Sequence, residues 1–187
     1  MPDLDADTLR TVLRRFATGV AVATTWDGER PWGTTVNSFS SVSLRPPLVL
    51  VALDRSRRIV PSLRRAGRYA VNILGEEHQA LSDCFAGGPA LAPAAGQRGD
   101  ERSELCGAEW RRGITGLPVL SVAIASLECT VVDIHAAGDH DLYIALVDSA
   151  AAAAAAAETP MPLLYYSGRY LRIERASSHD LEGKPER

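Results

Sequence analysis

The sequence predicts a mainly β protein with some α structure (α+β), in which an antiparallel β-barrel carries peripheral helices on its outside. Short apolar runs bounded by Gly, Pro, Asn and Asp recur along the chain, as is typical of strands and turns. These runs, about eight in number, are joined mostly as hairpins, which favours an antiparallel barrel over a doubly wound parallel sheet. The chain has 187 residues, of which 46% are apolar, so it is long enough for one core. We expect a single domain over residues 1–187, with its core at about 8–174 and a polar tail at 175–187.

The chain is expected to begin with an amphipathic helix over residues 5–18. Asp5 or Asp7 can cap its start, and Gly19 stands where the helix would end. Apolar side chains recur at helical spacing and so share one face. That face consists of Leu9, Val12, Leu13 and Phe16.

The next segments predict three strands. Residues 20–25 form an apolar strand, an Asp-Gly pair at 27–28 marks a hairpin turn, and the chain returns through residues 32–39. We interpret residues 33–43 as one continuous polar strand. Residues 48–53 are uniformly apolar, which is typical of a strand buried on both faces.

One helix is expected before the following strand and another after it. Ser56 is placed to cap the first helix, and Gly67 to end it. Pro61 lies inside this stretch, so the helix either begins later than Ser56 or is kinked. Residues 68–74 predict a strand, and residues 76–85 predict the second helix.

The second half of the chain is expected to open with a long surface loop at residues 87–104, rich in Gly, Pro and Ala. Residues 119–135 and 142–149 predict an antiparallel pair of strands. Residues 162–173 predict a last strand that turns at a Ser-Gly pair. The alanine tract at 150–157 is interpreted as a loop, because so short a run is a marginal helix.

The charge balance gives no electrostatic case for a nucleic acid or membrane partner. The net charge is −3 and the isoelectric point is about 5.8. The sequence contains no run of about 18 apolar residues, so no transmembrane helix is expected. The acidic N-terminus also lacks the basic and apolar regions of a signal peptide.

The three cysteines are expected to be unpaired. Cys84, Cys106 and Cys129 are widely spaced and form no C-x-x-C pair, so neither a zinc site nor a disulfide framework is indicated. We expect Cys84 and Cys129 to be buried as small apolar residues, and Cys106 to be exposed and oxidisable. A reducing cytoplasm fits this pattern.

Residues 33–43 and the turn that follows the buried strand carry the chemistry. Hydroxyls and amides occupy both faces of the polar segment and require hydrogen-bond partners. A contact within the barrel, a neighbouring subunit, a bound ligand or water along a sheet edge could supply them. Arg55, Ser56 and Arg57 stand where the buried strand ends and a helix is expected to begin. Such a turn is either a solvated basic turn or a phosphate site. Together, the two segments predict a site for a flat polar ligand with an anionic tail.

Eight segments, in order, resemble the flavin reductase-like family of NAD(P)H:flavin oxidoreductases, which serve two-component monooxygenases. The resemblance implies a split β-barrel of the FMN-binding type, usually a homodimer with its flavin near the subunit interface. It implies FMN or FAD as the flavin, NADH or NADPH as the electron donor and a monooxygenase as the partner. No metal site is expected. The matching segments are residues 16–25, 33–43, 46–51, 53–56, 67–74, 84–87, 138–140 and 162–170.

The resemblance also implies the residues of the site. His140, by itself a turn histidine, would contact and orient the nicotinamide, which makes it the catalytic candidate. Phe85 would close the flavin pocket, and Arg169 and Tyr170 would lie near the nicotinamide. Flavin contacts are implied for Thr34, Thr35, Val36, Asn37, Ser38, Ser40 and Ser41, and phosphate contacts for Asp54, Arg55, Ser56 and Arg57.

The chain departs from the family's pattern in its nicotinamide half. Asp141 stands where the family often has threonine, Leu171 stands where it often has histidine, and Ala145-Leu146 replaces Gly-Glu. We expect Asp141 to add negative charge that disfavours an anionic dinucleotide. Two other functions therefore stay open, a flavin-dependent oxygenase or oxidase of the same fold and a non-catalytic flavin-binding protein.

Overall fold

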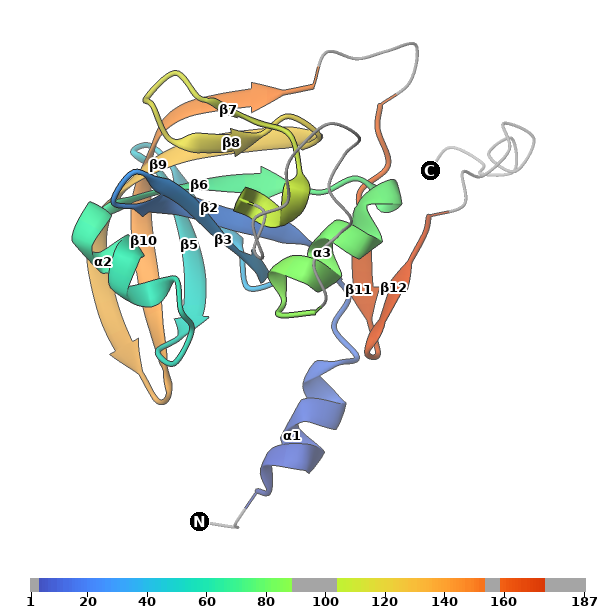
Figure 1. Ribbon diagram of the computed structural model, residues 1–187. Helices are drawn as coiled ribbons and strands as arrows, with labels where there is room; N and C mark the ends of the chain where they lie inside the picture. The colour runs from blue at the N-terminus through green and yellow to red at the C-terminus, as the bar shows by residue number, and fades with distance from the viewer. Residues whose placement is uncertain (1–3, 89–103, 154–158, 174–187) are drawn as a thin grey trace, which may run out of the picture.

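The protein is built around a seven-stranded sheet (Figure 1). The computed structural model describes residues 4–88, 104–153 and 159–173. The strands of this sheet are β2 (Ala21–Asp27), β3 (Arg30–Val36), β4 (Ser40–Leu44), β5 (Pro47–Asp54), β6 (Arg68–Ile73), β9 (Ala125–Ala137) and β10 (His140–Ala152). Their order is β3-β2-β6-β9-β10-β5-β4, and every neighbouring pair is antiparallel. This arrangement confirms the predicted antiparallel α+β fold.

Helices and shorter strands surround the large sheet. The helices are α1 (Ala6–Leu13), α2 (Val60–Ala66) and α3 (Gln79–Phe85), with the 3₁₀ turns η1 (Glu76–His78) and η2 (Glu104–Gly107). The shorter strands are β1 (Thr18–Gly19), β7 (Trp110–Arg112), β8 (Pro118–Leu120), β11 (Leu164–Tyr166) and β12 (Arg169–Leu171). They form a three-stranded sheet of order β1-β11-β12 and a β7-β8 pair.

The two edge strands of the large sheet, β3 and β4, are consecutive in the chain. Residues 37–39 carry the chain from one edge to the other, so the interpretation of residues 33–43 as one strand is wrong. The backbone has to leave the sheet there because its partner changes from β2 to β5. The Ser38 hydroxyl donates to the Ala52 carbonyl (2.6 Å) and accepts from the Ala52 N–H (3.2 Å), which ties the connection to β5. No ladder joins β3 to β4 within the described residues, so the barrel stays split.

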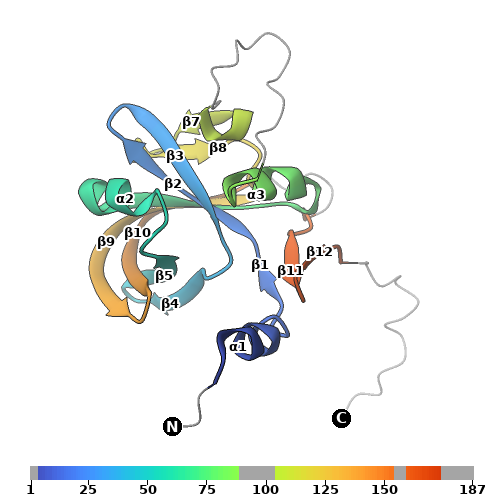
Figure 2. The ribbon, with the colours of Figure 1, turned by 60° about the horizontal axis from the view of Figure 1, so that its bottom comes forward.

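Apolar side chains pack on both faces of the sheet. On one face, Val51 and Tyr143 belong to a core that α2 completes. On the other face, Leu74 packs in a second core with Phe85 of α3. Successive side chains of a strand point to opposite faces, and β2 accordingly gives Ala23 to the first core and Val22 to the second. Each of these helices therefore covers one face (Figures 1 and 2).

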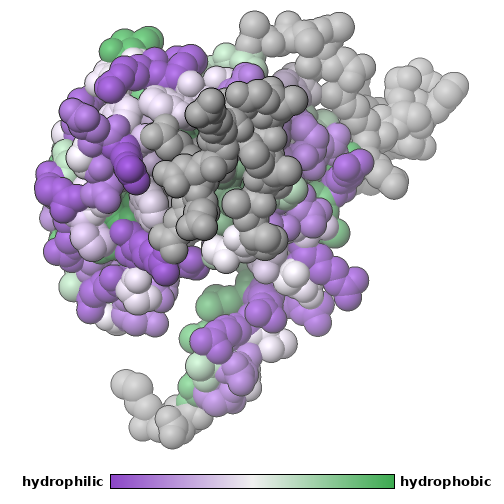
Figure 3. Space-filling model, in the orientation of Figure 1, coloured by the Kyte–Doolittle hydropathy of each residue, from purple (hydrophilic) through white to green (hydrophobic). Residues whose placement is uncertain are grey.

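Helix α1 is shorter than predicted and projects away from the sheets (Figures 1 and 2). The Asp5 carboxylate caps it by accepting hydrogen bonds from the N–H groups of Asp7 (3.0 Å) and Thr8 (2.8 Å). The helix ends at Leu13 because Thr18 and the following glycine belong to β1, which pairs with β11. None of its residues is buried, and hydrophobic surface is visible along it in Figure 3.

Helix α2 begins at Val60, so the predicted cap at Ser56 is wrong. The alternative of a later start is confirmed, because Pro61 lies in the first turn, where its missing N–H costs nothing. The Ser56 N–H instead donates to the Asp54 carboxylate (2.8 Å) and shapes a turn. Gly67 ends the helix with a φ of 62°, a left-handed conformation that glycine adopts readily.

Most other predicted elements lie where the sequence placed them, with shifted boundaries. Residues 119–135 are not one strand, because a turn at 121–124 separates β8 from β9. Residues 150–152 of the alanine tract continue β10 and pair with β9, so the tract begins as a strand. The rest of that tract, most of the expected loop and the polar tail fall on residues 154–158, 89–103 and 174–187, which lie outside the described residues.

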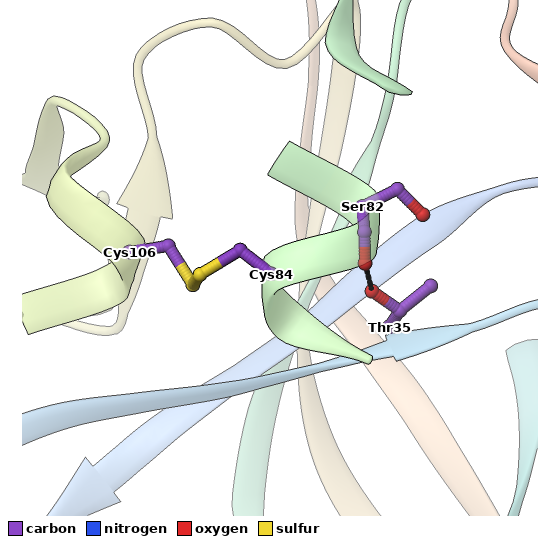
Figure 4. Close-up of a disulfide and its surroundings, with 4 residues drawn as sticks. All are labelled: Thr35, Ser82, Cys84 and Cys106. Carbon is purple, nitrogen blue, oxygen red and sulfur yellow. Dashed lines mark hydrogen bonds between the residues drawn. A yellow bond between two sulfur atoms is a disulfide. The ribbon is translucent and has the colours of Figure 1, made fainter. Parts of the chain in front are cut away.

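Cys84 and Cys106 form a disulfide that joins α3 to η2, so the prediction of unpaired cysteines is wrong (Figure 4). The two residues are 22 positions apart and have no diagnostic spacing, and only the fold brings them together. Cys129 is free and buried, as expected, and its burial raises the pKa of the thiol to about 12. The expected cytoplasmic location loses its support from the cysteine pattern.

Over the described ranges, no helix is long and apolar enough to cross a membrane. The described residues also contain no group of three or more His, Cys, Asp or Glu that is placed to hold a metal ion.

Candidate functional site

The predicted phosphate residues and His140 lie together at one end of the large sheet. Strand β5 ends at Asp54, β10 begins at His140, and the two residues are register partners. The Arg55 N–H donates to the Asp139 carbonyl (3.1 Å), which links the turn after β5 to the turn before β10. Hydrogen bonds from Ser56 hold the pKa of the Asp54 carboxyl below its usual value. Asp54 therefore shapes the turn.

His140 is held by its neighbour in the chain. Its Nδ1 lies 2.6 Å from Oδ1 of Asp139, and this hydrogen bond lowers the pKa of the Asp139 carboxyl. The imidazole is less than half exposed, whereas the carboxylate is largely exposed. This contact leaves Nε2 as the nitrogen that can face a ligand.

Asp141 is buried between two arginines that come from different elements. Its side chain is only 2% exposed. One carboxylate oxygen accepts from Arg55 Nε (2.8 Å), and the other accepts from Arg64 Nη2 of α2 (2.5 Å). The hydrogen bonds from Arg55 and Arg64 lower the pKa of the Asp141 carboxyl. The expectation that Asp141 presents free negative charge to a dinucleotide is therefore wrong, because two guanidinium groups surround it.

The polar connection between β3 and β4 adjoins this turn. Ser38 is bonded to Ala52, two residues before Asp54. Asn37, Ser40 and Ser41, which the resemblance marks as flavin contacts, are exposed beside it in the chain. The structure thus brings a row of exposed amide and hydroxyl groups next to a basic turn.

The predicted flavin residues of β3 itself are divided between its two faces. Thr34 and Val36 are buried, and Val36 belongs to the core under α2. Thr35 points the other way, and its hydroxyl donates to the Ser82 carbonyl of α3 (2.6 Å; Figure 4). Phe85 packs against β3 so closely that a Cβ on Gly33 would lie 2.7 Å from its ring. Residue 33 therefore has to be glycine for this packing.

Tyr170 belongs to a second group of predicted residues, around α3. Its hydroxyl lies 2.9 Å from Ser82 Oγ and donates to Asp83 Oδ1 (2.9 Å), and burial raises the pKa of the phenol. Arg169 is exposed on the same strand, β12. The β9–β10 turn and β12 lie at opposite sides of the molecule in both ribbon views (Figures 1 and 2). One subunit therefore does not bring His140 and Tyr170 together.

Sequence reasoning missed Arg64 and the role of Asp141. Alternation along β10 buries positions 141, 143 and 145, so the sequence places a carboxylate in a row of inward-facing positions. A buried carboxylate requires a partner, so the sequence could have predicted that Asp141 is paired. It could not have predicted which residue forms the pair, because α2 and β10 come together only in the folded protein.

Comparisons with known proteins place these features in context. A family model described as "Flavin reductase like domain" matches residues 13–174. The reductase subunit HsaB of a flavin-dependent monooxygenase from Mycobacterium tuberculosis (strain ATCC 25618 / H37Rv) is 33% identical over 171 residues, which are 91% of this chain and 84% of that protein. An NADH-dependent flavin reductase from Rhodococcus sp. is 35% identical over 176 residues, or 92% of this chain and 89% of that protein.

A similar solved structure is the NADH:FAD oxidoreductase SgcE6 of Streptomyces globisporus C-1027, in complex with NAD and FAD fragments. It superposes with a TM-score of 0.76 at 30% sequence identity. The match covers 91% of this chain and 93% of that one. The likeness therefore extends over nearly the whole domain.

Proposed function

Because this chain belongs to the flavin reductase family, we propose that it oxidises NADH, reduces FMN or FAD, and supplies the reduced flavin to a separate monooxygenase. Relatives named as an NADH-dependent flavin reductase and as the reductase subunit of a flavin-dependent monooxygenase support this proposal. NADH is favoured over NADPH as the electron donor because the names of several relatives specify it.

One observation carries the assignment of the site. The exposed amide and hydroxyl groups of the β3–β4 connection lie beside a basic turn, joined to it through Ser38 and Ala52. A flavin has a flat ring with polar atoms along one edge and an anionic phosphate tail, and these two surfaces match its two parts. Asn37, Ser40 and Ser41 would bond the ring edge, and residues 54–57 would hold the phosphate.

The protein's task in the reaction is to bind and orient. When bound, the flavin supplies the ring that accepts a hydride from the nicotinamide. Arg55 and Arg57 would hold the phosphate by charge-assisted hydrogen bonds. His140, with its Nδ1 held by Asp139, would orient the nicotinamide through Nε2. Phe85 would wall the site from the side of α3.

A turnover assay tests the function. Purified protein is mixed with NADH or NADPH and with free FMN or FAD, and the absorbance of the reduced nicotinamide is followed. We expect many turnovers per enzyme, faster with NADH than with NADPH. Flavin binding without nicotinamide oxidation would contradict the reductase function and leave a flavin-binding protein. Oxygen uptake that depends on an added organic substrate would point to an oxygenase.

Ser56→Asp tests the phosphate turn. A carboxylate at position 56 would stand beside the flavin phosphate, and like-charge repulsion is expected to weaken FMN binding by about tenfold, or about 1.4 kcal/mol. Flavin fluorescence titration measures the affinity. Ser121→Asp, at an exposed serine between β8 and β9, is the matched control. Unchanged affinity in the Ser56 variant would remove this turn from the site.

We further propose that the protein is a homodimer whose site is completed by the second subunit. The separation of His140 from Tyr170 supports this, because a partner subunit can bring the two groups of residues together. Exposed apolar side chains on α1, just after α1, on β4 and on β9 also support it. They are Leu9, Val12, Leu13, Phe16, Val42, Leu44, Val132 and Ile134. A cytoplasmic location stays a prediction.

A further inference from the structure

The fold does not require a charged side chain at position 141, and yet the residue there is an aspartate. Burying a carboxylate costs free energy, and a buried ion pair contributes little net stability compared with apolar residues of the same size. Asp141 nonetheless alternates with Tyr143 and Ala145 along the buried side of β10. Its two oxygens take one arginine each, Arg55 from the turn after β5 and Arg64 from α2. The arrangement therefore calls for a role beyond packing.

Arg55 is the residue that this arrangement orients. Its Nε donates to Asp141, its Nη2 donates to the His140 carbonyl (3.1 Å), and its backbone N–H donates to the Asp139 carbonyl (3.1 Å). The side chain is still 44% exposed. A guanidinium has five N–H donors, and these side-chain bonds use two of them. The group is thus held in one orientation with donors left over, at the basic turn.

We propose that Asp141 is a positioning residue that, together with Arg64, holds the Arg55 guanidinium toward the phosphate of the flavin. This inference rests on the proposed function and deepens it. Arg64 shares the charge of Asp141, so Arg55 is oriented without being fully neutralised. Arg55 in turn presents its remaining donors to the phosphate oxygens, a geometry that suits a planar guanidinium. Asp141 touches neither flavin nor nicotinamide in this role.

The test compares FMN with riboflavin, which carries the same ring without the phosphate. In Asp141→Asn, which keeps the shape of the side chain and loses its charge, we expect FMN affinity to fall by about tenfold. Riboflavin affinity is expected to stay unchanged. The KM for FMN should rise, while kcat at saturating FMN stays the same, because a positioning defect at the phosphate does not alter the ring. Fluorescence titration and NADH oxidation give these readouts.

Two further variants test whether Asp141 acts through Arg55. In an Arg55→Met background, Asp141→Asn is expected to cause no additional loss of FMN affinity, because the group that it orients is gone. Asp27→Asn is the matched control, since Asp27 pairs with Arg65, the neighbour of Arg64 in α2, and not with Arg55. It should leave the preference for FMN over riboflavin intact.

The outcomes separate this inference from the proposed function. Equal losses for FMN and riboflavin, or no loss for either, would overturn the positioning role. A wild-type protein that reduces both flavins and binds them with equal affinity would also overturn the positioning role, but it would support the reductase function. A wild-type protein that reduces neither flavin would instead refute the reductase function. If Asp141→Asn does not fold, Arg64→Gln at a half-exposed position carries the same test, with loss of FMN preference expected.

Discussion

At the scale of single residues, buried polar side chains in this protein hold turns in place. The Glu128 carboxylate accepts hydrogen bonds from the N–H groups of Ile114 (2.7 Å) and Thr115 (2.8 Å), and from the Thr115 hydroxyl. Gly113 lies directly against it, since a Cβ there would clash with a carboxylate oxygen of Glu128. Glu128 thus fixes the turn between β7 and β8 as Asp141 fixes Arg55.

Glu128→Gln is expected to destabilise the protein by about 1.5–3 kcal/mol, because charge-assisted hydrogen bonds are lost from a buried site. Burial raises the pKa of the Glu128 carboxyl, but hydrogen bonds from Thr115 and Ile114 outweigh this and leave it below its usual 4.5. The stabilisation is therefore complete above about pH 4.5 and is lost as the pH falls through the lower, folded-state pKa. Thermal unfolding against pH measures it. A Tm difference between variant and wild type that does not shrink in acid would contradict this explanation.

The sequence predicted individual polar residues well but not their partners. The hydroxyl-rich stretch around Ser38 was recognised as a region that needs hydrogen bonds, and it makes them with Ala52. Asp141 was interpreted as free charge because its position in the sequence says nothing of α2. Whether a charged side chain is buried and which residue it pairs with both depend on the fold, so the sequence alone reveals neither.

At the scale of elements, contacts from several parts of the chain anchor α3. The Thr35 hydroxyl bonds it to β3, Tyr170 bonds it to β12, and the Cys84–Cys106 disulfide joins it to η2. Phe85 at its end lies in the core between the helix and the sheet. Three separate parts of the chain therefore hold one short helix.

The disulfide gives a prediction that can be checked by counting thiols. The native protein should react slowly or not at all with a thiol reagent, since Cys129 is buried and its pKa is raised to about 12. Unfolded without reductant it should show one thiol, and after reduction all three. Replacing Cys84 and Cys106 together by serine should cost about 3 kcal/mol, because a loop of 22 residues is released in the unfolded chain. Three thiols in the unfolded, unreduced protein would contradict the pairing.

Element types were more predictable than element ends. Periodicity reports which side chains are buried, and it located the apolar strands and the helix at α3. It does not report which neighbour a strand pairs with. The break at residues 37–39 follows from a change of partner, and the early end of α1 follows from the pairing of β1 with β11. Both depend on contacts between distant parts of the chain.

At the scale of the whole molecule, the subunit has a helix, α1, whose apolar face stays exposed among the residues that the structure describes. Phe16, just after α1, is 77% exposed, and the apolar residues of α1 are also exposed. The hydrogen bond from the Ser167 N–H to the Arg14 carbonyl (2.8 Å) is a contact between the end of this helix and the rest of the subunit. Family membership and fold class were predictable from the order of the motifs, whereas the exposure of the apolar face of α1 was visible only in the structure.

The proposed homodimer predicts the mass of the protein in solution. Light scattering in solution should give twice the 20.0 kDa mass of one chain. Phe16→Glu should shift the protein to monomer and lower turnover with it, because it places a charge in an apolar interface. Thr11→Glu, on the opposite face of α1, should leave the dimer intact. A wild-type monomer with full activity would contradict both the dimer and the shared site.

The unburied α1 also has a consequence for the order in which the protein acquires its structure. The helix has only eight residues, and so short a helix is marginal by itself in water. Among the residues that the structure describes, its own chain offers no surface that covers its apolar face. If two subunits are needed to cover it, then α1 becomes ordered after the rest of the subunit, in a second-order step that depends on the concentration of finished chains.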